Sequence, residues 1–163
     1  MGTAAGAGAA HALPPEYALR PATAADYAFL WDLHVATMRP YVAATWGWDE
    51  SVQEQGFRRG FDPAQEQIIV VDGQDAGVLS VEERAEEVFL RHIEIAPQHQ
   101  RRGLGTAVIG DILARAQALG LPVTLRVLHV NPARGLYERL GFRVTGRTTT
   151  HSLMRRESPP AAD

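Results

Sequence analysis

The chain has 163 residues, 45% of them hydrophobic, which is enough for one compact domain with its own core. It contains no cysteine and no lysine, and this excludes disulfides, thiolate nucleophiles, lysine Schiff bases and a Walker-type phosphate loop. No apolar run reaches the roughly 18–20 residues of a membrane span, and the N-terminus lacks the basic flank of a signal peptide. We therefore expect a cytoplasmic protein without a membrane partner.

The formal charge of −3 conceals an uneven distribution along the chain. Residues 1–90 carry five arginines and 14 carboxylates, a balance of −9, whereas residues 91–147 carry nine arginines and three carboxylates, a balance of +6. Ligands of opposite charge on the two halves would explain this, and so would a solvated face on each half. The mild acidity and the absence of a recognisable reader motif argue against a nucleic-acid partner.

Low-complexity composition marks both ends of the chain. Residues 1–15 are rich in alanine and glycine and end in Pro-Pro, and residues 157–163 are similar, so both predict disorder. A single domain is expected over residues 16–156.

The front of this domain predicts one short strand and two helices. Thr23 followed by Asp26 resembles a capping box, which opens a helix from Ala24 to about Met38 that Pro40 ends. The remaining elements are a strand over residues 17–20, an aromatic connection over residues 41–48 and a helix over residues 49–57.

From residue 68 onward the hydrophobic pattern becomes that of strands alternating with helices. Asp72-Gly73 is a hairpin signal, and Gly120 sits where a helix-ending glycine belongs. Asn131 and Pro132 are the N-cap and first residue of another helix. The predicted strands are 68–71, 76–83, 88–95, 123–127, 142–144 and 148–154, with a long helix over 103–119. The fold class is therefore mixed α/β, with more consecutive strands than a doubly wound fold has.

The segment Gln100-Arg101-Arg102-Gly103-Leu104-Gly105 lies between a predicted strand and the long helix. Its glycines let the backbone approach a ligand closely, and free N–H groups at a helix start bind anions. The arginines add charge-assisted hydrogen bonds to phosphate, so a pyrophosphate group is the expected ligand.

Two other interpretations of this loop exist. A dinucleotide-binding fingerprint requires a small residue at position 108, but the chain has Val108 there. It also requires an acidic residue about 20 residues further on, and no acidic residue follows the next strand. A lone Gly-x-Gly can also merely end a strand beside solvated arginines.

Two segments in the second half resemble the GNAT N-acetyltransferase superfamily. Residues 91–109 (RHIEIAPQHQRRGLGTAVI) match its (Q/R)-x-x-G-x-(G/A) signature after a strand, and residues 130–142 (VNPARGLYERLGF) match its Asn…Ala…Leu-Tyr…Gly-Phe segment. The resemblance implies a mixed, mostly antiparallel sheet flanked by helices on both faces. It implies transfer of an acetyl group from the cosubstrate acetyl-CoA to a primary amine of a small molecule or peptide, by direct attack. Dimers are common among similar proteins, so a homodimer is an open option.

Acetyl-CoA binding is thereby assigned to the main chain and side chains around the loop. The implied residues are Ile93, Ile95, Gln100, Arg101, Arg102, Gly103, Leu104, Gly105, Thr106 and Asn131. Ile93–Ile95 would pair with the pantetheine like an added strand, and a backbone N–H near Ile95 would stabilise the oxyanion. Asn131 stands six residues before Tyr137, where the family usually has seven, and a plain helix N-cap explains it equally well.

Tyr137 and Glu94 are the catalytic candidates. Tyr137 matches the family's tyrosine, which implies that its hydroxyl donates a proton or a hydrogen bond to the departing thiolate. Alternatively, Tyr137 is a core aromatic residue whose hydroxyl is hydrogen-bonded. Glu94 lies between Ile93 and Ile95 in the strand, so its side chain would point to the opposite face of the sheet, toward the acceptor. There it could act as a base, bind a cationic acceptor, or form a structural ion pair with Arg126 on the neighbouring strand. His92 shares that face and is a weaker candidate. The histidines show no metal-ligand spacing, so no metal is expected.

The acceptor site is expected in the front half. Its candidates for an aromatic, acidic mouth are Trp31, Tyr41, Trp46, Trp48, Asp49 and Glu50, residues that could instead pack the helices on the sheet. Two functions compete with an N-acetyltransferase: a catalytically silent acyl-CoA-binding or regulatory domain, and a nucleotide-dependent oxidoreductase.

Overall fold

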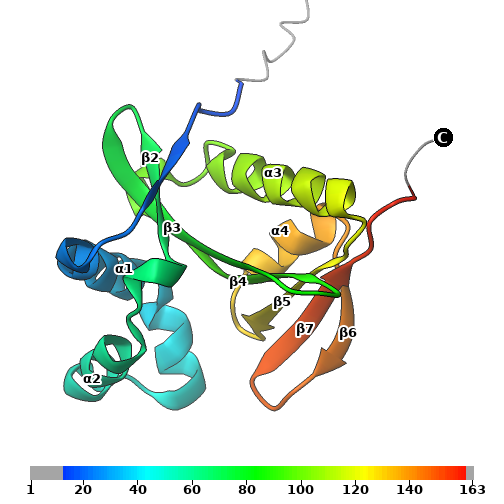
Figure 1. Cartoon of the computed structure of the whole chain (residues 1–163). Helices are drawn as coiled ribbons and strands as arrows, with labels where there is room; N and C mark the ends of the chain where they lie inside the picture. Colours follow the sequence, from blue (N-terminus) through cyan, green and yellow to red (C-terminus); the bar gives the residue numbers. More distant parts are fainter. Residues whose placement is uncertain (1–12, 161–163) are drawn as a thin grey trace, which may run out of the picture.

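A twisted mixed sheet forms the centre of the molecule (Figure 1). The structure, a computed structural model, describes residues 13–160, so the expectations for residues 1–12 and 161–163 lie outside it. Within the described residues the strands are β1 (Ala18–Pro21), β2 (Gln67–Val71), β3 (Gln74–Glu83), β4 (Val88–Ile95), β5 (Val123–Leu128), β6 (Arg143–Arg147) and β7 (His151–Arg156). Their order is β1-β2-β3-β4-β5-β7-β6, with β4 and β5 parallel and the other neighbours antiparallel.

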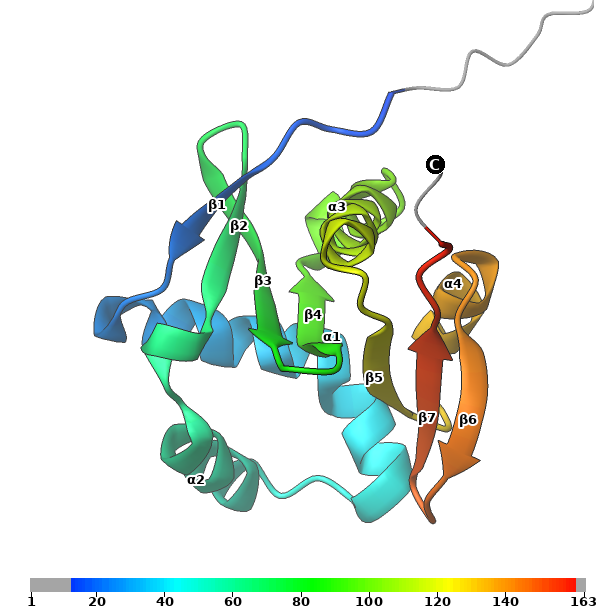
Figure 2. The same cartoon turned by 45° about the vertical axis from the view of Figure 1, so that its right-hand side comes forward.

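Helices cover both faces of this sheet (Figures 1 and 2). They are α1 (Tyr27–Trp46) and α2 (Glu50–Gly60) on one face, and α3 (Leu104–Leu119) and α4 (Ala133–Arg139) on the other. Each face has its own core: Leu30 and Leu33 of α1 meet Ile68 and Val78, whereas α3 and α4 share a larger cluster with the opposite side of the strands. The predicted fold class, mixed α/β with helices on both faces of a mostly antiparallel sheet, is confirmed.

Several local predictions are also confirmed by backbone geometry. Asp72 and Gly73 both have positive φ, 51° and 74°, as the tight β2–β3 hairpin requires. The Thr23 N–H donates to the Asp26 carboxylate at 2.8 Å, so the acid caps the turn that leads into α1. Gly120 ends α3 with φ 68°.

The prediction that Pro40 ends the first helix is wrong. α1 passes through Pro40 and continues to Trp46, where Gly47 with φ 81° ends it. A proline removes one backbone hydrogen bond, but the next turn buries Val42, and packing outweighs that loss. Figure 2 shows the axis of α1 changing direction along its length. The expected connection over residues 41–48 is therefore mostly helix.

Smaller differences occur at the C-terminal end. α4 begins at Ala133 rather than Pro132, and Phe142 precedes β6 instead of starting it. Thr148 is in the turn before β7, where its hydroxyl accepts from the His151 N–H at 2.9 Å. A side chain that satisfies the turn backbone thus replaces strand pairing there.

The two parallel strands diverge in the middle of the sheet. β5 pairs with β4 only from Val88 to Leu90, while β4 continues to Ile95 against β3 alone. The Ala96 N–H donates to the Ala76 carbonyl, so the backbone polar groups of Ala96 point toward β3. Along a strand these groups point to alternate sides, and the backbone N–H and C=O groups of Ile93 and Ile95 therefore face the gap between β4 and β5. Within residues 13–160 no helix is long and apolar enough to cross a membrane.

Candidate active site

The loop between β4 and α3 presents free backbone donors. Arg101 and Gly103 both have positive φ, 61° and 81°, which turns the chain sharply into the helix. The first helical bond runs from the Ala107 N–H to the Gly103 carbonyl at 3.0 Å. Among the described residues the N–H groups of 104–106 have no acceptor, and they meet the positive end of the α3 dipole.

A cavity of about 300 Å³ lies against these donors. Its walls include Gln100, Arg101 and Gly103–Thr106, together with Leu136 and Arg139 of α4. Arg102 is exposed and lines no part of it. The donor set and the arginines suit a pyrophosphate, which binds to backbone N–H groups and guanidinium.

A second cavity of about 390 Å³ continues from the first into the divergence between β4 and β5. Ile95, Gln100, Arg101 and Gly105 line both cavities, so the two are contiguous. The Gln100 side-chain amide donates to the Ile95 carbonyl at 2.8 Å, which ties the loop to the end of β4. An extended ligand would therefore run from the loop along the exposed edge of β4.

Tyr137 projects from α4 into this cleft. Its side chain is 8% exposed and meets Phe142 edge-on at a centroid distance of 5.7 Å. Burial raises the pKa of Tyr137 to about 12, so the phenol stays protonated at neutral pH. Tyr137 also belongs to the core cluster on this face, as the alternative interpretation expects, but within residues 13–160 its hydroxyl has no hydrogen-bond partner.

Asn131 lines the same cleft and also caps α4. Its side-chain oxygen accepts from the Ala133 N–H at 2.9 Å. The N-cap interpretation therefore describes the observed bond, although the helix begins one residue later than predicted.

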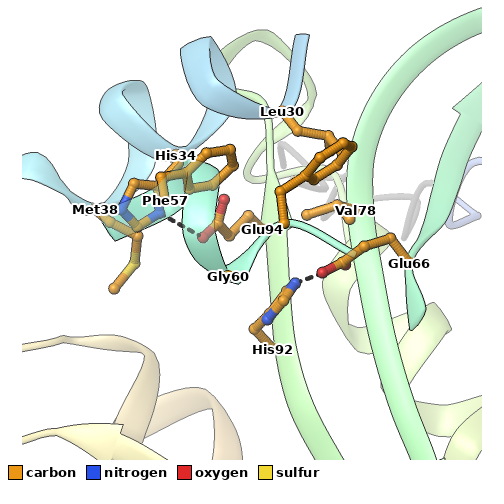
Figure 3. Close-up of a pocket in the computed structure, with 10 residues that line it drawn as sticks. Leu30, His34, Met38, Phe57, Gly60, Glu66, Val78, His92 and Glu94 are labelled. Carbon is orange, nitrogen blue, oxygen red and sulfur yellow. Dashed lines mark hydrogen bonds and ion pairs between the residues drawn. The ribbon is translucent and has the colours of Figure 1, made fainter. Parts of the chain in front are cut away.

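A third cavity, of about 320 Å³, lies on the opposite face of the sheet between α1, α2 and the strands β3 and β4 (Figure 3). Glu94 enters it from β4, and its Oε1 lies 3.2 Å from Nδ1 of His34 on α1. The Glu94–Arg126 pair considered from the sequence does not form, because β5 has left β4 four residues earlier. Glu94 also lines the β4–β5 cleft, so it stands where the two cavities meet.

A second acid–histidine pair lies beside the first (Figure 3). His92 Nε2 is 2.8 Å from Oε2 of Glu66, which precedes β2. Burial lowers the pKa of His92, but its hydrogen bond to Glu66 and the charges of Glu66 and Glu94 outweigh this effect, so the net pKa is raised. The pocket thus holds two carboxylates, each next to an imidazole.

Sequence reasoning missed most residues of this pocket. Leu30, His34 and Met38 follow one another at intervals of four on α1, a helical spacing that could have placed them on one face. Glu66 and Phe57 carried no such signal, because the chain brings them to β4 only through the folding of α2 and β2. Within residues 13–160 no group of three or more His, Cys, Asp or Glu side chains could hold a metal ion.

The predicted aromatic, acidic mouth is only partly assembled. Trp31 stacks on Trp48 at 6.2 Å, but Arg39 lies over Trp48, and the acids beside it bind locally. Asp49 caps α2 through the Val52 N–H, and Glu50 accepts from the Trp48 indole. Tyr41 lines the β4–β5 cleft instead, and Trp46 lies near His151. The six residues thus make separate local contacts, because the extended α1 carries Tyr41 and Trp46 beyond the Trp31–Trp48 stack.

Comparison with known proteins agrees with this architecture. The family model described as an acetyltransferase (GNAT) domain matches residues 64–144. Among solved structures, PaiA N-acetyltransferase from Thermoplasma acidophilum in complex with coenzyme A is 14% identical with a TM-score of 0.72, covering 87% of this chain and 99% of that one. The ribosomal-protein-S18-alanine N-acetyltransferase from Escherichia coli is 19% identical with a TM-score of 0.63, covering 91% and 97%.

A nourseothricin acetyltransferase structure shares 28% identity over 60% of this chain and 68% of that one, with a TM-score of 0.52. The family match includes β4, the loop at Gly103 and α4, the elements around which the cleft is built. The chain belongs to the GNAT family of acetyltransferases.

Proposed function

We propose that the protein transfers the acetyl group of acetyl-CoA directly to a primary amine. One observation carries the proposal: Glu94 and Met38 line both the cleft beside the anion-binding loop and the pocket on the other face of the sheet. Two ligands that approach from opposite sides would therefore meet at Glu94. The similarity to a structure determined with coenzyme A supports the choice of cosubstrate.

Acetyl-CoA supplies an activated acetyl thioester. The N–H groups of residues 104–106 and the Arg101 guanidinium would hold its pyrophosphate. The outward-facing main chain of Ile93 and Ile95 would bind the pantetheine as an added strand. These contacts fix the position of the thioester near Tyr137 and Glu94.

The amine must lose a proton before it attacks, because an ammonium nitrogen has no lone pair. Glu94 is placed to accept that proton, directly or through a water molecule. His34, 3.2 Å from the carboxylate, would orient it and share the charge. The Ile95 N–H would donate to the carbonyl oxygen as its negative charge develops.

Tyr137 would stabilise the departing sulfur. As the new C–N bond forms and the C–S bond breaks, the sulfur gains negative charge that needs a hydrogen-bond donor. The buried phenol remains protonated, since its pKa is about 12. It therefore acts as a persistent donor, and the excess proton of the attacking nitrogen passes to the departing sulfur, so that CoA leaves as a free thiol while the amide forms.

A thiol-release assay tests the proposal. The purified protein is incubated with acetyl-CoA and a panel of primary amines while free thiol is followed. We expect thiol release that depends on the amine and yields one acetylated amine per thiol. Binding of acetyl-CoA without amine-dependent release would instead identify a silent acyl-CoA-binding or regulatory domain. Stabilisation by NAD(P) but not by CoA would favour the oxidoreductase.

A further inference from the structure

We propose that the pocket between α1, α2 and β4 selects a compact amine with one positive charge and a broad apolar body, aromatic or branched aliphatic. This inference rests on the proposed function, because it assigns the pocket to the amine that would attack the thioester. It narrows the acceptor from any primary amine to one chemical class.

Five side chains from α1, α2, β3 and the segment after α2 form an apolar wall of the pocket: Leu30, Met38, Phe57, Phe61 and Val78. Leu30 and Val78, each 3% exposed, belong to the core on this face. Phe57 and Phe61 lie nearly parallel at 6.4 Å between ring centroids, and Met38 completes the wall. Because core packing fixes these side chains, an apolar body would bury its surface without reorganising the pocket.

The polar groups form two pairs, each with one member on β4: Glu94 with His34 of α1, and His92 with Glu66 (Figure 3). Glu66 is bonded to His92 at 2.8 Å, and this close contact occupies its carboxylate. Glu94 has the longer contact, 3.2 Å to His34, and it alone of the two acids also lines the cleft. The pocket thus offers one carboxylate to one ammonium, at the end nearest the thioester.

The dimensions of the pocket favour a compact guest. Its volume of about 320 Å³ is near the lower end of small-molecule sites, which span roughly 300–1,000 Å³. With the ammonium at Glu94, the rest of the amine lies against Phe57 and Phe61. A second ammonium there would lose its water without gaining a free carboxylate, and a slender chain would leave the aromatic wall poorly filled.

A matched amine panel tests the inference. Hexylamine and hexamethylenediamine differ only in the second charge, and benzylamine and Nα-acetyllysine amide compare a broad body with a slender peptide-borne one. We expect kcat/KM to be highest for benzylamine, and about 100-fold lower for the diamine than for hexylamine. Preference for the diamine or for the lysine derivative would overturn the inference.

Two glycines of α2 provide a matched pair of variants. Gly60 lines the pocket, and a Cβ there meets no atom within 4 Å, so Gly60→Leu can add bulk without a clash. Gly56, one turn earlier, is equally open but lies outside the pocket. Gly60→Leu should raise KM for benzylamine about tenfold and leave methylamine less affected, whereas Gly56→Leu should change neither. Equal effects of the two variants would contradict the assigned pocket.

Direct binding separates this inference from the proposed function. Calorimetry of the CoA-bound protein measures the affinity for each amine whether or not transfer occurs. Tighter binding of benzylamine than of the diamine, without thiol release, would support the pocket and reject the enzyme activity. Thiol release that is fastest with the diamine would support the enzyme and reject the selectivity.

Discussion

The cavities on the two sides of the sheet are built by different means. On the α3 side, a contiguous loop around Gly103 presents backbone N–H groups whose positions follow from local φ values and a helix start. On the α1 side, the pocket is made of side chains from two helices, two strands and a connecting segment. A backbone-built site depends on a few conformations within one short segment, whereas a side-chain-built site depends on the packing of distant elements.

The largest effect is expected where the backbone itself forms the site. Gly103→Val places a branched side chain at φ 81°, beside the donors of the loop. We expect affinity for acetyl-CoA to fall by about 1,000-fold, because the loop can no longer present its N–H groups to the phosphates. Calorimetry with acetyl-CoA measures the loss.

Gly120→Val is the matched control for this prediction. It introduces comparable strain at φ 68° at the far end of the same helix, away from every residue of the loop. Its affinity for acetyl-CoA should equal that of the wild type. If Gly120→Val weakened binding as much as Gly103→Val, general destabilisation of α3 would explain both results.

Tyr137→Phe removes one hydroxyl from the cleft and should mainly affect turnover. We expect kcat to fall about 100-fold while acetyl-CoA affinity changes less than about threefold, because the phenol acts on charge that develops during the reaction. Since the pKa of Tyr137 is about 12, its deprotonation should cause no loss of wild-type rate below about pH 11. Unchanged turnover in Tyr137→Phe would exclude the donor role.

Glu94→Gln tests the side-chain-built pocket. We expect kcat/KM at neutral pH to fall roughly 30-fold. The decrease is smaller than for a reaction that depends entirely on one general base, because water can also accept the proton of the amine. The deficit should shrink as the pH approaches the amine pKa of about 10, where the neutral amine becomes common. A deficit that stayed constant with pH would contradict a role of Glu94 toward the ammonium, whether in binding it or in removing its proton.

The smallest expected effect concerns the scaffold that positions α1. Asp26 accepts two hydrogen bonds from Arg20 of β1, at 2.9 and 3.0 Å, and these bonds lower its pKa to about 2. Because the pKa of Asp26 is lowered in the folded state, the ionised carboxylate stabilises the fold at any pH above the ordinary carboxylate pKa of 3.8. This stabilisation is lost as the pH falls through about 2. Asp26→Asn should cost about 2 kcal/mol at pH 7.

Acid titration of the melting temperature checks this assignment. Wild type should lose stability relative to Asp26→Asn between about pH 4 and pH 2, where the two curves converge. The variant should weaken amine binding more than acetyl-CoA binding, because α1 carries His34 and Met38. Parallel curves over the whole pH range would show that Asp26 does not carry the stabilisation.

The same contrast explains what the sequence could predict. The loop and the tyrosine of α4 lie in the two short segments that resemble the family, and the glycine at the end of α3 follows a helical run, so short stretches of sequence were sufficient to place all three. His34 and Glu66 are 32 residues apart and share a pocket only because α1 and β2 both reach β4. Pro40 misled the helix boundary, because local propensity does not include the burial of Val42.

The uneven charge has a more specific interpretation in the structure. Arg101 of the basic segment lines the cavity beside the loop, consistent with a phosphate guest. The two pocket carboxylates, however, come from both halves of the chain: Glu66 from the acidic half and Glu94 from the basic one. Six other acids of residues 1–90 pair with arginines away from this pocket: Asp26, Glu54, Asp75, Glu82, Glu83 and Glu87. The net balance of a half therefore did not locate the acceptor site.

Direct attack of the amine excludes an acetylated protein intermediate, and an isotope label distinguishes the two routes. The protein is incubated with acetyl-CoA carrying an isotopically labelled acetyl group, first alone and then with benzylamine, and both protein and amine are analysed by mass spectrometry. The account predicts no acetylated protein and labelled N-acetylbenzylamine formed at the rate of thiol release. Accumulation of an acetyl-protein that then passes its label to the amine would contradict it.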